Sequence, residues 1–164
     1  MPNKCKFIFK SFSIFFLLLA ASCASLNQQQ SFEATYIGKF QLTQDNNSSI
    51  FNITISKSSE IIIIQVKKAL LGNMAKITIE KSKPISVFPK QDYKYRNLLN
   101  EISPDTYLSF INKCLELKKV DNKITEINNN NLNIACAFED NFKSILIQSK
   151  DGYFVKGKLK KYED

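Results

Sequence analysis

Few side chains in this sequence are suited to chemistry, and its thiols are the most reactive of them. The chain has four cysteines and no histidine, so it lacks the commonest general base and metal ligand. It also lacks a Gly-x-Ser-x-Gly segment, a His-Glu-x-x-His segment, cysteine pairs at zinc spacing and a glycine-rich phosphate loop. Its carboxylates are scattered. We therefore expect no catalytic residue, no metal site and no bound cofactor.

Cys23 stands at the end of a segment with the layout of a secretory signal peptide. Three lysines among the first ten residues precede an apolar run from 11 to 22, which ends in small residues. This run is too short to span a bilayer, which takes about 20 residues. The segment Leu19-Ala20-Ala21-Ser22-Cys23 resembles the lipobox of bacterial lipoproteins. The alternative is an ordinary cleaved signal peptide in which Cys23 is incidental.

The lipobox resemblance implies where the protein resides. In bacterial lipoproteins the chain is cut before the cysteine, whose sulfur carries a diacylglycerol. Ala24, rather than an aspartate, follows the cysteine, and this implies the periplasmic face of the outer membrane in a Gram-negative bacterium. We expect a lipid anchor with no other prosthetic group. The chain is then divided into a signal peptide at 1–22, a lipidated polar tether at 23–31 and a single domain at 32–164.

Lysines and arginines outnumber acidic residues by 23 to 15, but they are scattered along the chain. Scattered lysines do not predict nucleic-acid binding. They are more typical of a solvated face, which can meet acidic partners or lipid head groups.

Cys114 and Cys136 remain after Cys5 is removed with the signal segment. They are 22 residues apart, in a compartment that permits disulfides. Their spacing alone does not decide between a disulfide and two separate buried thiols.

The elements that must position these residues are mostly strands. Apolar and polar residues alternate over 32–40, 51–55 and 132–138, as on strands with one buried face. Further strands are predicted at 61–66, 74–80, 85–88, 123–127, 144–149 and 153–159. Polar clusters at 45–49, 57–60 and 128–131 indicate turns, and Asp151-Gly152 indicates a hairpin.

Between these strands the hydrophobic period changes to that of a helix. Ser103 followed by Pro104 predicts a helix start, and an apolar stripe runs on to Leu117. A shorter helix is predicted over 93–102. The resulting fold class is α+β, mainly β. It consists of a curved antiparallel sheet that forms a half-open barrel, with one or two helices over its concave apolar face.

The order of elements behind a lipobox resembles the LolB family of outer-membrane lipoproteins. The likeness rests on Ile37-Gly38-Lys39-Phe40, on Phe51 to Ile55, on Ala69-Leu70-Leu71-Gly72 and on the helix over 103–117. Members receive other lipoproteins from a soluble periplasmic carrier and pass them to the outer membrane without catalysis. The resemblance implies these partners: a carrier, lipoprotein acyl chains and outer-membrane lipid. We expect a monomer.

Two sites follow from the resemblance and the alternation. Leu70 and Leu71, followed by Gly72, are neighbours and cannot both face one core, so one should be exposed for membrane insertion. An acyl cavity would be lined by residues on the apolar faces of the strands and helix, namely Phe40, Phe51, Ile53, Ile62, Ile64, Ile77, Tyr107 and Ile111. The alternatives are an accessory lipoprotein with a filled core and a general lipid-binding module.

Overall fold

The computed structural model describes residues 32–45, 47–89, 99, 102–118 and 124–163. Phe32–Asp164 forms one compact unit. The predicted lipidation site, Cys23, and nearly all of the helix predicted at 93–102 lie outside the described residues.

Nine antiparallel strands form a single sheet, in the order β5-β4-β3-β2-β1-β9-β8-β7-β6. In chain order they are β1 (Ala34–Gln44), β2 (Asn47–Lys57), β3 (Ile61–Lys68), β4 (Gly72–Glu80), β5 (Ser86–Phe88), β6 (Thr125–Asn128), β7 (Leu132–Glu139), β8 (Phe142–Ser149) and β9 (Phe154–Lys161). Helix α3 (Pro104–Glu116) is inserted between β5 and β6. The predicted α+β, mainly β class with a curved antiparallel sheet is thus confirmed.

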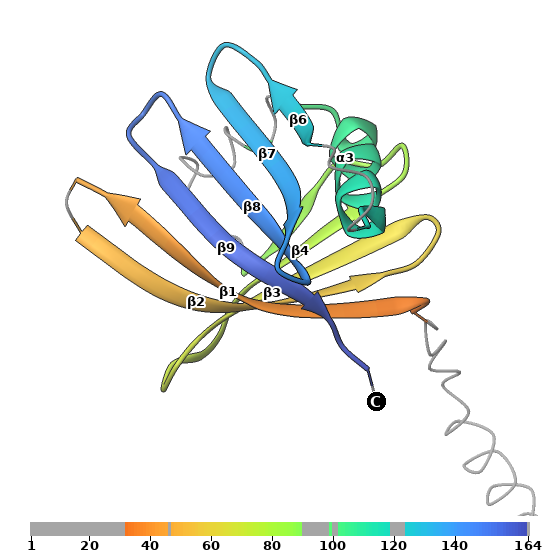
Figure 1. The fold of residues 1–164 in the computed structure, drawn as a ribbon, viewed down its shortest axis with the longest axis horizontal. Coiled ribbons are helices and arrows are strands. Elements are labelled where there is room, and N and C mark those ends of the chain that lie inside the picture. The colour runs from red at the N-terminus through yellow and green to blue at the C-terminus, as the bar shows by residue number, and fades with distance from the viewer. Residues whose placement is uncertain (1–31, 46, 90–98, 100–101, 119–123, 164) are drawn as a thin grey trace, which may run out of the picture. The chain divides into compact units, whose positions relative to one another are not determined.

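The sheet curves around α3. This helix contacts both β4 and β6, although these strands lie close to opposite edges of the sheet (Figure 1). Only a strongly bent sheet can bring both strands to one helix. The side that faces α3 is the concave face. Among the described residues β5 and β6 form the two edges of the sheet, which is not closed into a barrel.

Tight turns join most neighbouring strands. Between β7 and β8, Asp140 and Asn141 both have positive φ, as the two central residues of a type I′ hairpin do. Between β1 and β2 the turn is shorter than the polar cluster at 45–49 predicted. Ser48 and Ser49 pair with Thr43 and Leu42 and therefore belong to β2.

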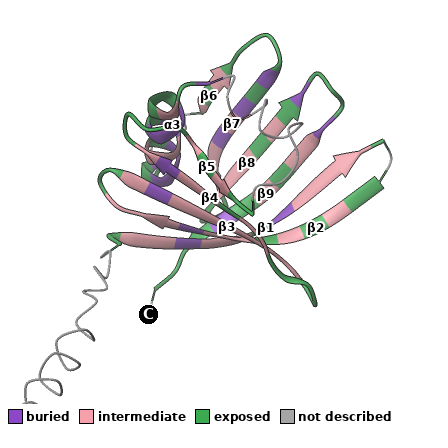
Figure 2. Ribbon diagram, turned by 180° about the vertical axis from the view of Figure 1, so that it is seen from behind, coloured by how far each residue is buried: buried purple, intermediate pink, exposed green. Residues whose placement is uncertain are grey.

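The packed core lies between α3 and the concave face. Ile62, Cys136 and Leu159 are fully buried there, and Figure 2 shows buried segments on the strands and on α3. Alternation along β1 explains which of its residues belong to the core. Tyr36 and Phe40 point to the core, while Lys39 between them is exposed.

Candidate functional site

The tip of the β3–β4 hairpin exposes two leucines. Leu70 is fully exposed and has a φ of 68°, while 64% of Leu71 is exposed. Gly72 follows with a φ of 73°, a conformation that L side chains rarely adopt. Ile62 and Ile79 pair with each other in the core, near the end of the hairpin opposite this tip. Figure 1 shows β3 and β4 side by side.

Lysines flank this tip on the β3 side. Lys67 and Lys68 end β3 and are half-buried, and Lys68 Nζ lies 5.8 Å from the centre of the Phe51 ring. The hairpin therefore has apolar side chains at its tip and ammonium groups on the adjoining end of β3. This arrangement suits a boundary between acyl chains and polar head groups.

Of the eight residues predicted to line an acyl cavity, six are on the concave face of the sheet, and Tyr107 and Ile111 are on α3. Pairing across the sheet puts Phe40 beside Phe51 and aligns Ile64 with Ile77 on the same face. Three of the eight (Phe40, Ile62 and Tyr107) are buried in the core. The other five are half-buried, namely Phe51, Ile53, Ile64, Ile77 and Ile111.

The concave face is packed where α3 crosses it. Ser103 caps the helix by accepting a hydrogen bond from the Thr106 N–H through its side chain, and Pro104 occupies its first turn. A disulfide joins Cys114 of α3 to Cys136 of β7, so the sheet and the helix are covalently tied. The helix is therefore a fixed part of the core.

Polar contacts hold the end of α3 against the concave face. The Tyr36 hydroxyl donates to the Leu115 carbonyl oxygen at 3.4 Å, and Lys57 Nζ lies 2.8 Å from Glu116 Oε1. Burial raises the pKa of Tyr36; the nearby Lys57 lowers that pKa and Glu116 raises it further.

Lys143 is a second lysine on the concave face that the sequence patterns did not single out. Its Nζ donates to the Leu117 carbonyl oxygen at 2.6 Å and lies 4.3 Å from the centre of the Phe138 ring. Burial lowers the pKa of Lys143. The carbonyl and the ring compensate part of the cost of placing an ammonium group on an apolar face.

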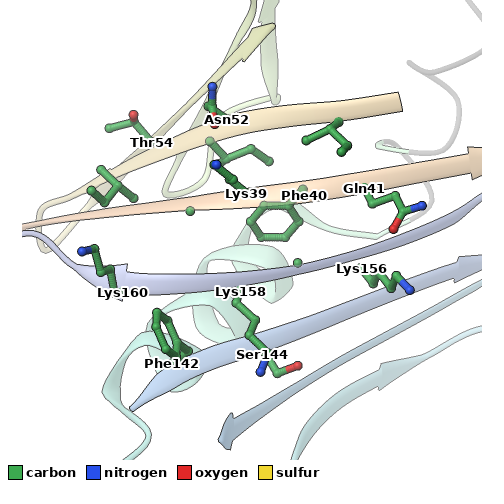
Figure 3. Close-up of a pocket in the computed structure, with 15 residues that line it drawn as sticks. Lys39, Phe40, Gln41, Asn52, Thr54, Phe142, Ser144, Lys156, Lys158 and Lys160 are labelled. Atoms are coloured by element: carbon green, nitrogen blue, oxygen red, sulfur yellow. The ribbon is translucent and has the colours of Figure 1, made fainter. Parts of the chain in front are cut away.

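A groove of about 880 Å³ lies over β1, β2, β8 and β9. Most of its lining belongs to the convex face, opposite the predicted acyl cavity, because it comes from positions that alternate with the core residues of these strands. Lys39, Lys156, Lys158 and Lys160 line it together with Gln41, Asn52, Thr54 and Ser144 (Figure 3).

The sequence contains one local signal for this groove, from which we predicted no site. Lys156, Lys158 and Lys160 alternate on one face of β9. Only the tertiary structure shows that Lys39 of β1 pairs directly with Lys158, and that the two strands are neighbours despite their separation in the chain.

Two further findings bear on the site. Among the described residues, no cluster of three or more histidine, cysteine or acidic side chains could hold a metal ion. Within the same part of the chain, no helix combines the length and apolarity needed to cross a membrane.

Comparison with known proteins leaves the functional interpretation to the structure. No family model and no curated protein sequence matches this chain.

Proposed function

We propose that this protein is a lipid-anchored outer-membrane lipoprotein that accepts the acyl chains of other lipoproteins from a periplasmic carrier and releases them into the outer membrane. The observation that carries the proposal is the exposed leucine pair at the tip of the β3–β4 hairpin. No covalent chemistry is required, because each step moves an apolar chain between apolar surroundings.

The exposed leucines have no folding role. Leu70 is fully exposed and Leu71 largely so, and neither belongs to the core. Burying a leucine among acyl chains contributes about 1.5–3 kcal/mol, so two leucines give the tip a substantial affinity for a bilayer. Lys67 and Lys68 extend that contact to anionic head groups.

The half-buried part of the concave face supplies the acceptor surface. Ile64 and Ile77 are cross-strand partners on the concave face, and Ile53 of β2 is the diagonal neighbour of Ile64. Each residue of this apolar row packs against the core while keeping part of its surface accessible. Acyl chains laid along this row would bury that remaining surface, at about 25 cal/mol per Å².

A second candidate function is that of an accessory lipoprotein that acts through protein contacts. The packing of α3 favours it, because Cys114, Leu115 and Leu117 fill the space between helix and sheet. The two functions differ in one measurable property, which is the binding of an acyl chain.

The first test replaces the tip leucines with glutamate, Leu70→Glu and Leu71→Glu together. Uptake of a fluorescent acylated peptide by the chain from residue 24 onward should persist, because the concave face is unchanged. Delivery of that peptide to vesicles should fall at least about tenfold. Loss of even one leucine contact with the bilayer costs about 1.5 kcal/mol, and about 1.4 kcal/mol corresponds to a factor of ten. The melting temperature should remain within a degree or two, roughly, because exposed substitutions change stability little.

The matched control is the double variant Phe88→Glu and Ile124→Glu. These side chains are also large, apolar and exposed, and their replacement changes the net charge by the same amount. The control should deliver the peptide as well as the unaltered protein does. If the unaltered protein binds no acylated peptide at all, the accessory function is the correct one. If the leucine variant unfolds, the pair belongs to the core.

A further inference from the structure

The groove on the convex face has an unbalanced positive charge. Lys39, Lys156 and Lys160 are exposed along it, and none of the described residues that line it is acidic. Lys158 has a carboxylate nearby, but Asp140 Oδ2 is 3.9 Å from its Nζ and both side chains are largely exposed. An exposed pair at this distance neutralises little of the local charge.

The placement of these lysines works against the stability of the sheet. Lys39 and Lys158 are direct cross-strand partners, and like charges opposite one another on a sheet are destabilising. Lys156 and Lys160 stand two residues to either side of Lys158 on the same face. Lys158 Nζ also lies 5.9 Å from the centre of the Phe142 ring. An anionic ligand would offset the repulsion among the ammonium groups of this cluster.

The rest of the lining offers hydrogen-bonding groups and apolar surface that a polypeptide can contact. Gln41, Asn52, Thr54 and Ser144 provide amide and hydroxyl groups, while Ile37, Ile50 and Phe142 provide apolar surface. Figure 3 shows the labelled polar side chains arranged along β1, β2, β8 and β9 around Phe40. A ligand with only phosphate groups would use the lysines and leave the apolar surface without a partner.

The spacing of the lysines matches an extended chain. Alternate residues on a strand are about 7 Å apart, so Lys156, Lys158 and Lys160 present three ammonium groups at that interval. An extended segment with acidic residues at alternate positions carries its carboxylates at the same interval. A flat layer of lipid head groups does not match the shape of a groove of about 880 Å³ that extends over four strands.

We propose that this groove binds an extended acidic segment of a partner protein, with carboxylates at alternate positions opposite the lysines of β9. The site is on the face of the sheet opposite to α3. It is therefore separate from the acyl-binding function proposed above and goes beyond it.

The test measures binding of a fluorescent decapeptide with alternating glutamate and threonine to the full chain in an uncharged detergent. The groove variant carries Lys39→Gln, Lys156→Gln and Lys160→Gln. The control carries Lys81→Gln, Lys113→Gln and Lys150→Gln, which are exposed lysines outside the groove with the same total charge. We expect about tenfold weaker binding in the groove variant and less than a twofold change in the control.

Two further probes test whether binding depends on the spacing of the glutamates and on the class of ligand, and not only on total charge. A peptide of the same composition with its glutamates consecutive should bind several-fold more weakly than the alternating peptide. Binding of the full chain to phosphatidylglycerol vesicles should be weakened equally in the groove variant and in the control variant. The proposal is overturned if the alternating peptide does not bind, if both lysine variants lose binding equally, or if only vesicle binding depends on the groove lysines.

Discussion

At the scale of single residues, two glycines set how closely β1 and β9 pack. A Cβ added to Gly157 would collide with the Phe40 ring and lie 2.7 Å from the Lys39 carbonyl oxygen. A Cβ on Gly38 would collide with the Lys158 carbonyl oxygen. The ring of Phe40 therefore covers the space that a side chain on β9 would otherwise occupy, and this packing fixes the centre of the sheet.

Gly157→Ala should lower the free energy of unfolding by about 1–3 kcal/mol, the usual cost of overpacking a core. The measurement is urea unfolding followed by circular dichroism. Gly152→Ala provides the comparison, because its Cβ would meet nothing within 4 Å and only its φ of 81° opposes the change. That backbone strain should cost about 1–2 kcal/mol. A Gly157→Ala variant as stable as the unaltered protein would show that Phe40 can move aside.

At the scale of elements, α3 is held by three kinds of interaction at once. Its N-terminus is capped by Ser103, its buried stripe packs on the sheet, and the disulfide ties Cys114 to β7. The disulfide closes a loop of 22 residues between helix and sheet. Loops of that size, closed in the unfolded chain, contribute about 3 kcal/mol by the entropy they remove.

The double variant Cys114→Ser and Cys136→Ser should therefore unfold at a lower urea concentration, with about 3 kcal/mol less stability. A reducing agent should shift the unaltered protein by a similar amount and leave the double variant unchanged. Equal stability of the unaltered protein with and without the reductant would mean that the two thiols are not joined in solution.

At the scale of the whole molecule, the concave and convex faces of the sheet are suited to different ligands. The concave face is apolar and partly covered by α3, while the convex groove is lined with lysines. Leu70 and Leu71 are exposed in the turn between β3 and β4. The proposed transfer also requires that the protein be held at the membrane, and the lipid predicted on Cys23 would hold it there.

Cys23→Ser should abolish incorporation of labelled palmitate and leave the longer precursor uncut, because the modified thiol is what the lipoprotein peptidase requires in proteins with a lipobox. Cys5→Ser is the control, since it removes a thiol from the predicted signal segment and leaves the predicted lipobox unchanged. It should be labelled and cut normally. Normal processing of Cys23→Ser, with no label on the unaltered chain, would identify an ordinary signal peptide.

The sequence alone determined most of the elements of this fold. Alternation placed the core residues of β1, β2 and β7 on one face, and Ser103 with Pro104 located the start of α3 within one residue. These signals are local, because side-chain period and capping depend on neighbours a few residues away. The adjacency of Leu70 and Leu71 predicted that one of them is exposed; the structure exposes both, because they lie in the turn between β3 and β4 and not on a strand.

Only the tertiary structure decided which segments meet. It paired β1 with β9, and this pairing brought Lys39 opposite Lys158 and created the convex groove, of which the local pattern indicates only the alternating lysines of β9. It also joined Cys114 to Cys136, where the spacing had left two alternatives open. The physical reason is the same in both cases: contacts between distant segments depend on strand order and sheet curvature, which are set by packing over the whole domain.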